Sequence, residues 1–324
     1  MKAIDSLVEQ LTLQEKAALL EGYHTWMTHA IPRLGIDAVY MTDGPLGVRK
    51  KRSVHGSGVM GLGGILPSTA FPAPAALACG WDRRLAEQVG SAIAKECRAY
   101  DVQILLAPGI NLKRDPRCGR NFEYFSEDPL LAGELGAAYC RGVEGEGVAA
   151  CVKHFALNNS ENYRYMGDSV VDERVARELY LKAFEIAIVK GRPRTVMCGY
   201  NKINGVHCSE NPWLLTDVLR RQWGFSGLVM TDWGATRDRV AGVKAGLDLT
   251  CPVGYGITAE AYCGLRGWLP AGALDASVRR VLELATDGAA PGREPMEPLF
   301  AHHELAVETA CQCAVLLQTM GSCR

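Results

Sequence analysis

Polar side chains able to do chemistry follow short apolar runs at several points of this sequence. The residues in such positions include Asp43, Lys153, His154, Tyr200, Asp232 and Trp233. A carboxylate at the end of a rigid strand can attack the anomeric carbon of a sugar, and a second carboxyl group about 5–5.5 Å away can serve as acid and then base. Asp232 suits the attacking role, and the neighbouring Trp233 can pack on the apolar face of a sugar ring.

A second set of side chains carries groups that hold hydroxyls. A carboxylate at Asp43 can accept two hydrogen bonds at once, although its Asp-Gly-Pro context is also typical of an ordinary turn. Lys153 and His154, with Arg120 as a third donor, suit a polyol because charged donors form stronger hydrogen bonds than neutral ones. Neighbouring strand residues face opposite sides, so Lys153 and His154 can reach one site only where their strand ends.

The elements that must position these residues are short strands alternating with helices. Apolar runs lie at Ala38–Met41, Ile104–Ala107, Val148–Val152, Thr195–Cys198, Leu228–Met230 and Leu247–Leu249. Helical spacing marks Asp82–Ala99, Trp213–Trp223 and Asp172–Lys190, where Asp172 can cap the helix. Short runs that are apolar throughout are typical of strands buried on both faces, and their alternation with helices predicts a parallel α/β fold.

Two observations favour a barrel over an open sheet. Polar residues at the carboxyl ends of successive strands converge on one site in a barrel. A dinucleotide-binding sheet would need a glycine-rich turn after its first strand, and Gly61–Gly64 does not fit that pattern. We therefore predict a (β/α)8 barrel of the TIM type over residues 1–286, a linker over 287–299 and the start of a second α/β domain over 300–324. In that last segment we expect a helix at Glu304–Cys313 and a strand at Ala314–Leu317.

The composition narrows the range of partners. The 324 residues carry a formal net charge of -1 without a long basic or acidic run, so we expect a small neutral ligand and no nucleic acid. No apolar run reaches the ~20 residues of a membrane span and the N-terminus lacks the apolar core of a signal peptide, so we predict a cytoplasmic protein without a membrane partner. The sequence leaves the oligomeric state open.

Neither cysteine nor histidine spacing predicts a metal site. The 12 cysteines are scattered, and we expect them to be reduced and mostly buried. The histidines show no ligand spacing apart from the adjacent His302 and His303, which we expect to be exposed. We therefore expect no metal and no organic cofactor.

Five blocks of the sequence carry a resemblance to a known family. They read Thr42-Asp-Gly-Pro-Leu-Gly47, Pro108-Gly-Ile-Asn-Leu-Lys-Arg-Asp-Pro-Arg-Cys-Gly-Arg-Asn-Phe-Glu-Tyr-Phe-Ser-Glu-Asp128, Val152-Lys-His-Phe-Ala-Leu-Asn-Asn-Ser-Glu161, Thr195-Val-Met-Cys-Gly-Tyr-Asn-Lys-Ile-Asn-Gly-Val-His-Cys-Ser-Glu-Asn-Pro-Trp213 and Gly224-Phe-Ser-Gly-Leu-Val-Met-Thr-Asp-Trp-Gly-Ala235. In this order they resemble the family three glycoside hydrolases, which include β-glucosidases and β-xylosidases, over roughly residues 7–317.

The resemblance implies roles for single residues. It makes Asp232 the nucleophile of a retaining, exo-acting β-glycosidase that releases terminal nonreducing β-D-glucosyl or related residues through a covalent glycosyl-Asp232 intermediate. The residues implied to bind the sugar or to line its subsite are Asp43, Arg120, Lys153, His154, Met197, Tyr200 and Trp233, with Glu161 and Arg164 near the same rim.

The acid/base is not found in the chain. The resemblance implies a glutamate from a second domain or, in one branch of the family, an Asp-His pair on the loop after the Lys-His strand. The matching loop, Asn158 to Asp172, holds Glu161 and Asp168 but no histidine. Two alternatives therefore stay open. One is a sugar-binding remnant without turnover, truncated before the second domain, and the other is a barrel lyase or aldolase that uses Lys153 as a Schiff base.

Overall fold

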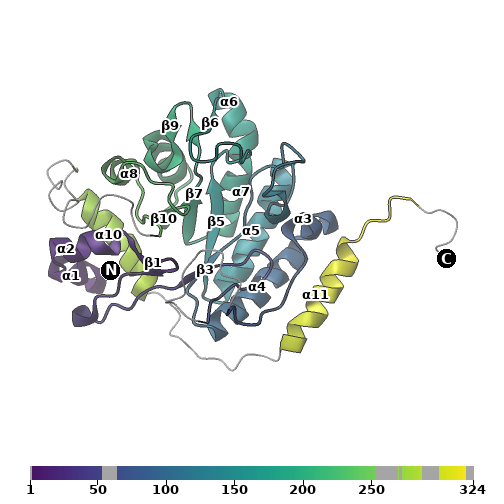
Figure 1. Ribbon diagram of the computed structural model, residues 1–324, viewed down its shortest axis with the longest axis horizontal. Coiled ribbons are helices and arrows are strands. Elements are labelled where there is room, and N and C mark those ends of the chain that lie inside the picture. Colours follow the sequence, from purple (N-terminus) through teal and green to yellow (C-terminus); the bar gives the residue numbers. More distant parts are fainter. Residues whose placement is uncertain (1, 53–63, 253–268, 270–271, 287–298, 319–324) are drawn as a thin grey trace.

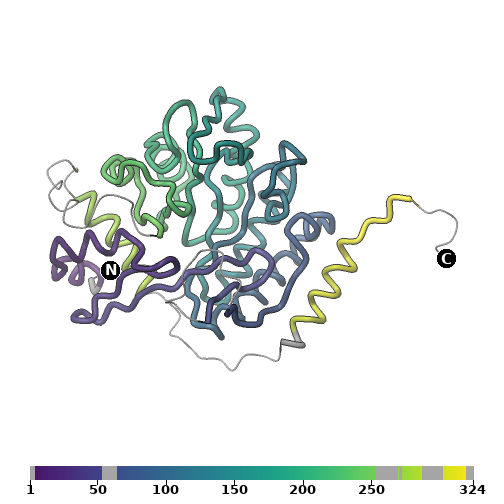
Figure 2. Tube along the Cα trace, viewed as in Figure 1, coloured from purple at the N-terminus to yellow at the C-terminus, as the bar shows by residue number. Residues whose placement is uncertain are grey.

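A parallel sheet of five strands lies at the centre of the molecule (Figures 1 and 2). The computed structural model describes residues 2–52, 64–252, 269, 272–286 and 299–318. In spatial order the strands are β10 (Leu228–Thr231), β7 (Thr195–Cys198), β5 (Ala149–Phe155), β4 (Ile104–Leu106) and β3 (Met41–Asp43). Every neighbouring pair is parallel. The predicted α/β fold is thus confirmed. β3 begins later than the predicted run Ala38–Met41, and it ends at Asp43.

Backbone pairing continues beyond β10. Met230 pairs in parallel with Leu249, in the last of the predicted runs, and Thr250 pairs in parallel with Glu21. The amide of Gly22 donates a hydrogen bond of 2.9 Å to the carbonyl oxygen of Thr250. The sheet therefore extends through residues 249–250 to the beginning of β1 (Gly22–His24).

The other edge of the sheet is reached by a short hairpin. β1 pairs antiparallel with β2 (Met27–Thr28), and Met27 pairs antiparallel with Tyr40, just before β3. Pairing thus runs from β10 round to β3, in keeping with the predicted TIM-type barrel. Within the described residues, β2 differs from this prediction because it is antiparallel both to β1 and to Tyr40. Parallel neighbours need a crossover of about a dozen residues, whereas only Thr25 and Trp26 join β1 to β2.

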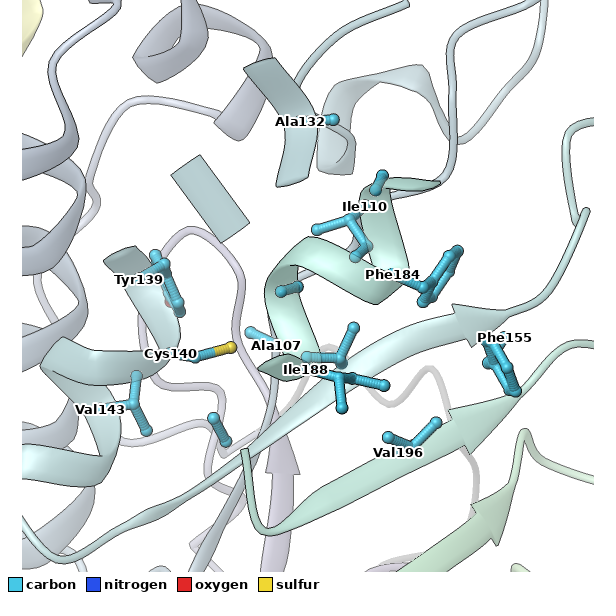
Figure 3. Packing of buried hydrophobic residues seen from close by; sticks show 14 of the residues in the cluster. Ala107, Ile110, Ala132, Tyr139, Cys140, Val143, Phe155, Phe184, Ile188 and Val196 are labelled. Atoms are coloured by element: carbon cyan, nitrogen blue, oxygen red, sulfur yellow. The ribbon is translucent and has the colours of Figure 1, made fainter. Parts of the chain in front are cut away.

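Strand side chains alternate between two apolar clusters. The inner cluster includes Ile104, Leu106, Cys151, Met197 and Met230, and residues of α1 (Lys2–Gln10), α2 (Leu13–Leu19) and α10 (Ala273–Thr286) join it. The outer cluster includes Leu105, Val152, Val196 and Val229, and Figure 3 shows part of it. An alternation of period two is what strands buried on both faces require, so the apolar runs were correctly interpreted.

Three long helices cover the outer side of the sheet (Figure 1). They are α4 (Arg83–Ala99), as predicted, α5 (Pro129–Gly145) and α7 (Lys182–Gly191). Asp82 and Asp128 cap the first two by accepting hydrogen bonds from amides of the first turn. Gly142 lets α4 and α5 approach closely, because a Cβ there would lie 2.0 Å from the carbonyl oxygen of Glu87.

The remaining elements are short. The predicted helix Asp172–Lys190 is confirmed as α6 (Glu173–Val175), a π-helical turn (Ala176–Tyr180) and α7, with Asp172 as its N-cap. The predicted helix Trp213–Trp223 is a π-helix over Trp213–Gln222. The others are α3 (Pro74–Leu77), α8 (Arg239–Ala245), β6 (Asp168–Ser169), β8 (Lys202–Ile203), β9 (Val206–His207) and 3-10 turns at Pro32–Leu34, Ala78–Gly80, Asn121–Glu123 and Cys208–Glu210.

α11 (Leu299–Cys313) packs on the outside of the barrel, against α3 and α4. His302 is buried in this contact, and its Nδ1 lies 2.8 Å from Oε1 of Glu96. The prediction of an exposed His302 is therefore wrong. The local sequence did not reveal its partner, a carboxylate buried in a helix some 200 residues earlier.

The segment after α11 differs from the prediction. Residues 314–318 form no strand, so the predicted strand Ala314–Leu317 is wrong. Leu317 is 91% exposed, because no strand within the described ranges pairs with this segment. The predicted linker falls almost wholly on residues 287–298, which lie outside the described residues.

Cysteine burial agrees with the expectation for thiols. The described cysteines are all free, and those that are buried are Cys97, Cys140, Cys151, Cys198, Cys208, Cys251 and Cys313. Burial raises the pKa of Cys151 and of Cys208 to about 12, so these thiols stay protonated and unreactive at neutral pH. As for membranes, none of the helices described here has both the length and the apolar surface needed to cross a bilayer.

Candidate active site

The candidate residues gather at the carboxyl ends of the parallel strands. Asp43 is the last residue of β3, Lys153 and His154 lie near the end of β5, and Asp232 directly follows β10. Tyr200 lies two residues beyond β7. The strand-end pattern in the sequence therefore marks one end of the sheet, where the side chains interact with one another as described below.

Asp232 has two oxygens in different surroundings. Oδ1 accepts hydrogen bonds from the Tyr200 hydroxyl at 2.9 Å and from the Trp233 amide at 2.7 Å. Oδ2 has only longer contacts, 3.4 Å to Nη1 of Arg120 and 3.5 Å to Nε2 of His154. The carboxylate is therefore fixed through one oxygen while the other keeps lone pairs available. Burial and the charge of Asp232 raise the pKa of Tyr200, which keeps its hydroxyl protonated as a donor.

Arg120 and His154 form the side of the site next to Oδ2. Nη2 of Arg120 lies 2.6 Å from Nε2 of His154, and Tyr124 Oη lies 3.0 Å from Nδ1. A guanidinium only donates, so Nε2 accepts and Nδ1 carries the proton. Burial and the charges of Arg120 and Lys153 hold the pKa of His154 well below its ordinary value of 6.5. His154 is therefore a neutral imidazole of defined tautomer.

Lys153 is paired with carboxylates on two sides. Nζ donates to Oδ1 of Asp43 at 2.8 Å and lies 3.5 Å from Oε2 of Glu123. Burial alone would lower the pKa of Lys153, but the negative charges of Asp43 and Glu123 outweigh it and raise the pKa above the ordinary 10.5. Burial would likewise raise the pKa of Asp43, and the charge of Lys153 outweighs it and lowers the pKa. A permanently protonated amine is no nucleophile, which argues against the Schiff-base alternative.

An irregularity in β5 brings Lys153 and His154 to the same site. The pairing register between β5 and β7 shifts between Lys153 and Phe155, as at a β-bulge, which redirects side chains near the end of a strand. Asn111 holds this backbone, because its side chain accepts from the His154 amide at 2.7 Å and donates to the His154 carbonyl at 2.9 Å. Asn111 was not predicted from the sequence, because it lies in a loop and does not directly follow an apolar run.

The loop after β5 contributes one carboxylate to the site. Glu161 lies 2.7 Å from Nε of Arg164 and 3.7 Å from Nη1 of Arg120. Burial raises the pKa of Glu161 above its ordinary 4.5 in spite of the two guanidinium groups. Asp168 instead accepts from the Gly205 amide and Asp172 caps α6, so both have structural roles.

A polar cavity adjoins this loop. It has a volume of about 280 Å³ and is lined by Glu161, Asn159, Ser160 and Arg117, among others. Arg164 also lies at the site, because its guanidinium is 4.3 Å from the centre of the Tyr200 ring. Glu161 and Arg164 thus belong to the same cluster as Asp232, as the resemblance implied for the rim.

Trp233 and Met197 take up different positions. Nε1 of Trp233 donates to the carbonyl oxygen of Thr25 at 2.9 Å, and its ring centre lies 5.0 Å from that of Trp26. Trp233 thus stands at the edge of the site beside the β1–β2 hairpin. Met197 is buried in the inner apolar cluster, where it pairs with Lys153 in the register of β5 and β7.

Glu123 is a second site residue that we did not predict from the sequence. It is 5% exposed, and its Oε1 accepts from Nε of Arg120 at 2.5 Å. Its other oxygen faces Lys153. The signal was present in the sequence, because Glu123 lies three residues after Arg120 in the same resembling block, but it follows no strand. We define the polar cluster as Asp43, Arg120, Glu123, Lys153, His154, Glu161, Arg164, Tyr200 and Asp232.

The chemistry of this cluster does not suit a metal ion. Its carboxylates are matched with arginine or lysine rather than turned toward a common point. Across the described part of the chain, no group of three or more His, Cys, Asp or Glu side chains could hold a metal. A carboxylate with one oxygen free of short hydrogen bonds, surrounded by hydrogen-bond donors, is instead suited to bond cleavage in a polyol.

Comparison with known proteins identifies the family. The model of the family described as "Glycosyl hydrolase family 3 N terminal domain" matches residues 42–284. These residues include most strands of the barrel and the whole polar cluster. The chain belongs to glycosyl hydrolase family 3. The resemblance seen in the five sequence blocks is thereby confirmed.

Relatives within family 3 include enzymes of different names. Thermostable beta-glucosidase B of Acetivibrio thermocellus is 47% identical over 318 residues, which is 97% of this chain and 42% of that protein. An exo-alpha-(1->6)-L-arabinopyranosidase of Bifidobacterium longum is 41% identical over 96% of this chain and 41% of its own length. This chain thus spans less than half the length of these curated relatives.

Solved structures of family 3 share the fold. Beta-glucosidase 3B of Thermotoga neapolitana, in complex with glycerol, superposes with a TM-score of 0.91 at 38% identity, covering 99% of this chain and 48% of that one. The same protein in complex with glucose gives 0.91 at 39% identity, covering 98% of this chain and 48% of that one. The likeness supports the TIM-type barrel.

Proposed function

We propose that this chain carries the nucleophile and the sugar-binding groups of a retaining, exo-acting β-glycosidase, acting on terminal nonreducing β-D-glucosyl or related residues. The observation that carries the proposal is the asymmetry of Asp232: Oδ1 is held by two short hydrogen bonds, while Oδ2 has only contacts of 3.4 Å or more. A carboxylate held in this way keeps its orientation and can still form a bond.

The proposed reaction proceeds in two displacements. Oδ2 of Asp232 attacks the anomeric carbon, the bond from that carbon to the leaving oxygen breaks, and that oxygen takes a proton from a general acid outside the cluster. Water then attacks the same carbon, returns a proton to that group and releases the sugar, and the carboxylate of Asp232 is restored. Two inversions leave the configuration of the anomeric carbon unchanged.

Two cations and one carboxylate of the cluster bind the sugar in this proposal. Arg120 and Lys153 donate charge-assisted hydrogen bonds to hydroxyls, and Asp43 accepts from them. The three are held by partners within 2.8 Å of their charged atoms, so little order is lost on binding. Trp233, at the edge of the site, presents its ring to the sugar.

The proton for the leaving group is the part of the reaction that the cluster does not supply. Glu161 is the only carboxyl of the 158–172 loop that contacts the cluster among the described residues, and it is paired with Arg164 at 2.7 Å. The resemblance implies a glutamate from outside the barrel. Loss of a general acid costs about 10²–10⁴-fold in rate, and less with an activated leaving group.

The experiment uses dinitrophenyl β-D-glucoside, whose leaving group needs little protonation, with proton NMR to follow the anomer first released. We expect slow hydrolysis that gives the β-anomer first and is absent in Asp232→Asn. The α-anomer as first product would overturn the retaining mechanism. Glucose binding without any hydrolysis would favour the sugar-binding remnant. Dinitrophenyl α-L-arabinopyranoside, assayed beside the glucoside, tests the sugar preferred, since relatives carry both activities in their names.

A further inference from the structure

Glu123 is the buried carboxylate that connects the two sugar-binding cations. Oε1 lies 2.5 Å from Nε of Arg120, and Oε2 lies 3.5 Å from Nζ of Lys153. Among the ion pairs of the described residues, no other carboxylate pairs with both cations. A carboxylate this deeply buried is stable only with such partners, so the three side chains form one unit.

Arg120 has other acceptors within reach. Its Nη1 lies 3.4 Å from Oδ2 of Asp232 and 3.7 Å from Oε1 of Glu161. The hydrogen bond between Nε and Glu123 is the shortest ion pair that Arg120 makes. If the charge on Glu123 were removed, Asp232 would be the next carboxylate to attract the guanidinium. A closer Arg120 would occupy the lone pairs of Oδ2 that the attack requires.

The charge of the cluster depends on Glu123 as well. Four carboxylates (Asp43, Glu123, Glu161 and Asp232) face three cations (Arg120, Lys153 and Arg164), and His154 is neutral. Arg49 adds a further positive charge near Asp43. Glu123 supplies one of the negative charges, in surroundings where charges are poorly screened. A negative charge there favours the positive charge that develops on the sugar ring in the oxocarbenium-like transition state.

We propose that Glu123 is a positioning residue of this glycosidase site: it holds Arg120 away from the attacking oxygen of Asp232, aligns Arg120 and Lys153 for the sugar, and contributes one negative charge to the site. The role rests on the proposed function. It acts through Arg120, Lys153 and Asp232, and it requires no contact between Glu123 and the substrate.

The test compares Glu123→Gln with a matched control, Glu134→Gln. Glu134 also bridges an arginine and a lysine, Arg83 and Lys190, but on the surface of the outer helices. The first measurement is the rate at which a 2-fluoro dinitrophenyl β-glucoside labels the protein, followed by intact mass. We expect labelling at least about tenfold slower in Glu123→Gln and unchanged in Glu134→Gln. Equal rates in all three proteins would overturn the proposal.

The second measurement separates charge from structure and needs no turnover. Calorimetry compares a protonated iminosugar with neutral gluconolactone. We expect Glu123→Gln to weaken the iminosugar about tenfold more than the lactone, because the site loses one negative charge. Equal weakening of both ligands would mean a structural role only and would overturn the electrostatic part. If the wild type is never labelled, the nucleophile assignment fails, and this ligand pair alone decides the role of Glu123.

Glu123→Asp keeps the inference testable if the glutamine variant does not fold. The shorter carboxylate retains the charge but cannot reach both cations. We expect it to keep the preference for the iminosugar and to label slowly. Wild-type labelling in Glu123→Asp would show that the alignment of Arg120 and Lys153 does not depend on this bridge.

Discussion

Two buried aspartates near neighbouring strands differ in how their carboxylate oxygens are engaged. Asp248 accepts from the Val229 amide at 2.8 Å, from Arg220 at 2.7 Å and, with its other oxygen, from Arg280 at 2.8 Å. Asp232 has short hydrogen bonds to one oxygen only. Asp232 follows an apolar run and Asp248 lies within one, and both are buried, so the type of residue and its burial do not distinguish them.

The difference lies in how completely each carboxylate is satisfied. With both oxygens engaged by short hydrogen bonds, two of them charge-assisted, Asp248 has no lone pair directed at a ligand, and its charge is neutralised within the protein. Oδ2 of Asp232 has no contact shorter than 3.4 Å among the described residues, as the proposed attack on the sugar requires. The proposed mechanism therefore uses the carboxylate that has an oxygen without a short hydrogen bond, and we expect the fully hydrogen-bonded one to contribute to stability.

The largest expected effect is on catalysis at Asp232. Asp232→Asn should lower kcat/KM for dinitrophenyl β-D-glucoside by about 10⁴-fold or more, because an amide does not attack the anomeric carbon. Steady-state kinetics measure this, with Asp217→Asn as a surface control, since Asp217 pairs with Arg221 on an exposed helix face. Asp248→Asn, if folded, should stay within a few fold of wild type. Loss of activity in folded Asp248→Asn would contradict a purely structural role for Asp248.

Stability should respond in the opposite order. Asp248→Asn should lower the free energy of unfolding by about 3 kcal/mol, because it leaves the partly buried Arg220 and Arg280 without their charge partner. Asp232→Asn should cost less than about 1 kcal/mol, since Arg120 keeps Glu123. Urea unfolding of both variants checks this. Equal destabilisation by the two substitutions would show that the hydrogen bonds of Asp248 contribute no more to stability than those of Asp232.

Tyr200 tests whether the hydrogen bonds to Oδ1 orient Asp232. Tyr200→Phe removes one of the two short hydrogen bonds to Asp232 and keeps the ring over which Arg164 lies. We expect kcat/KM to fall by about 10–100-fold, because the nucleophile is less well oriented. Labelling kinetics with the 2-fluoro glycoside measure the effect on the first displacement. An unchanged rate would mean that the Trp233 amide suffices to hold Asp232.

The smallest effect is a pH dependence at the Asp43–Lys153 pair. The folded state lowers the pKa of Asp43 below 3.8, so its contribution to stability is present above that pH and is lost as the pH falls through the lowered value. Asp43→Asn should therefore be less stable than wild type at pH 7, and the gap should close below pH 3.8. Thermal unfolding at several pH values measures the gap. A gap that does not change with pH would contradict the ion pair.

The ion pair between Asp43 and Lys153 should persist at alkaline pH. The folded state raises the pKa of Lys153 above 10.5, so its contribution to stability is present below that pH and is lost only as the pH rises through the raised value. The difference between Asp43→Asn and wild type should therefore persist up to pH 10.5. Closure of the gap below pH 9 would show that Lys153 is not held in its charged form.

Strand-end reasoning predicted the residues that directly follow short apolar runs. Asp43, Lys153 and Asp232 were found in this way, because the carboxyl ends of parallel strands meet and the apolar runs mark where each strand ends. Asn111 and Glu123 were missed. Both lie in the long loop after β4, whose course is set by contacts with distant residues rather than by any periodicity of the sequence.

Errors elsewhere have the same origin. His302 was expected to be exposed because its partner Glu96 lies in a distant helix. The antiparallel β2 could not be foreseen, since a strand of two residues leaves no periodic pattern. Ala314–Leu317 has the composition of a strand, but a strand forms only beside a pairing partner, and none lies next to it in the part of the chain that the structure describes.

The most direct test of the account locates the covalent sugar. The protein is incubated with a 2-fluoro dinitrophenyl β-glucoside, digested, and the modified peptide is sequenced by tandem mass spectrometry. The account predicts a single adduct on Asp232, absent in Asp232→Asn and retained in Glu134→Gln. An adduct on Asp43, Glu123 or Glu161, or no adduct on folded protein with any of the gluco, xylo and arabino reagents, would contradict it.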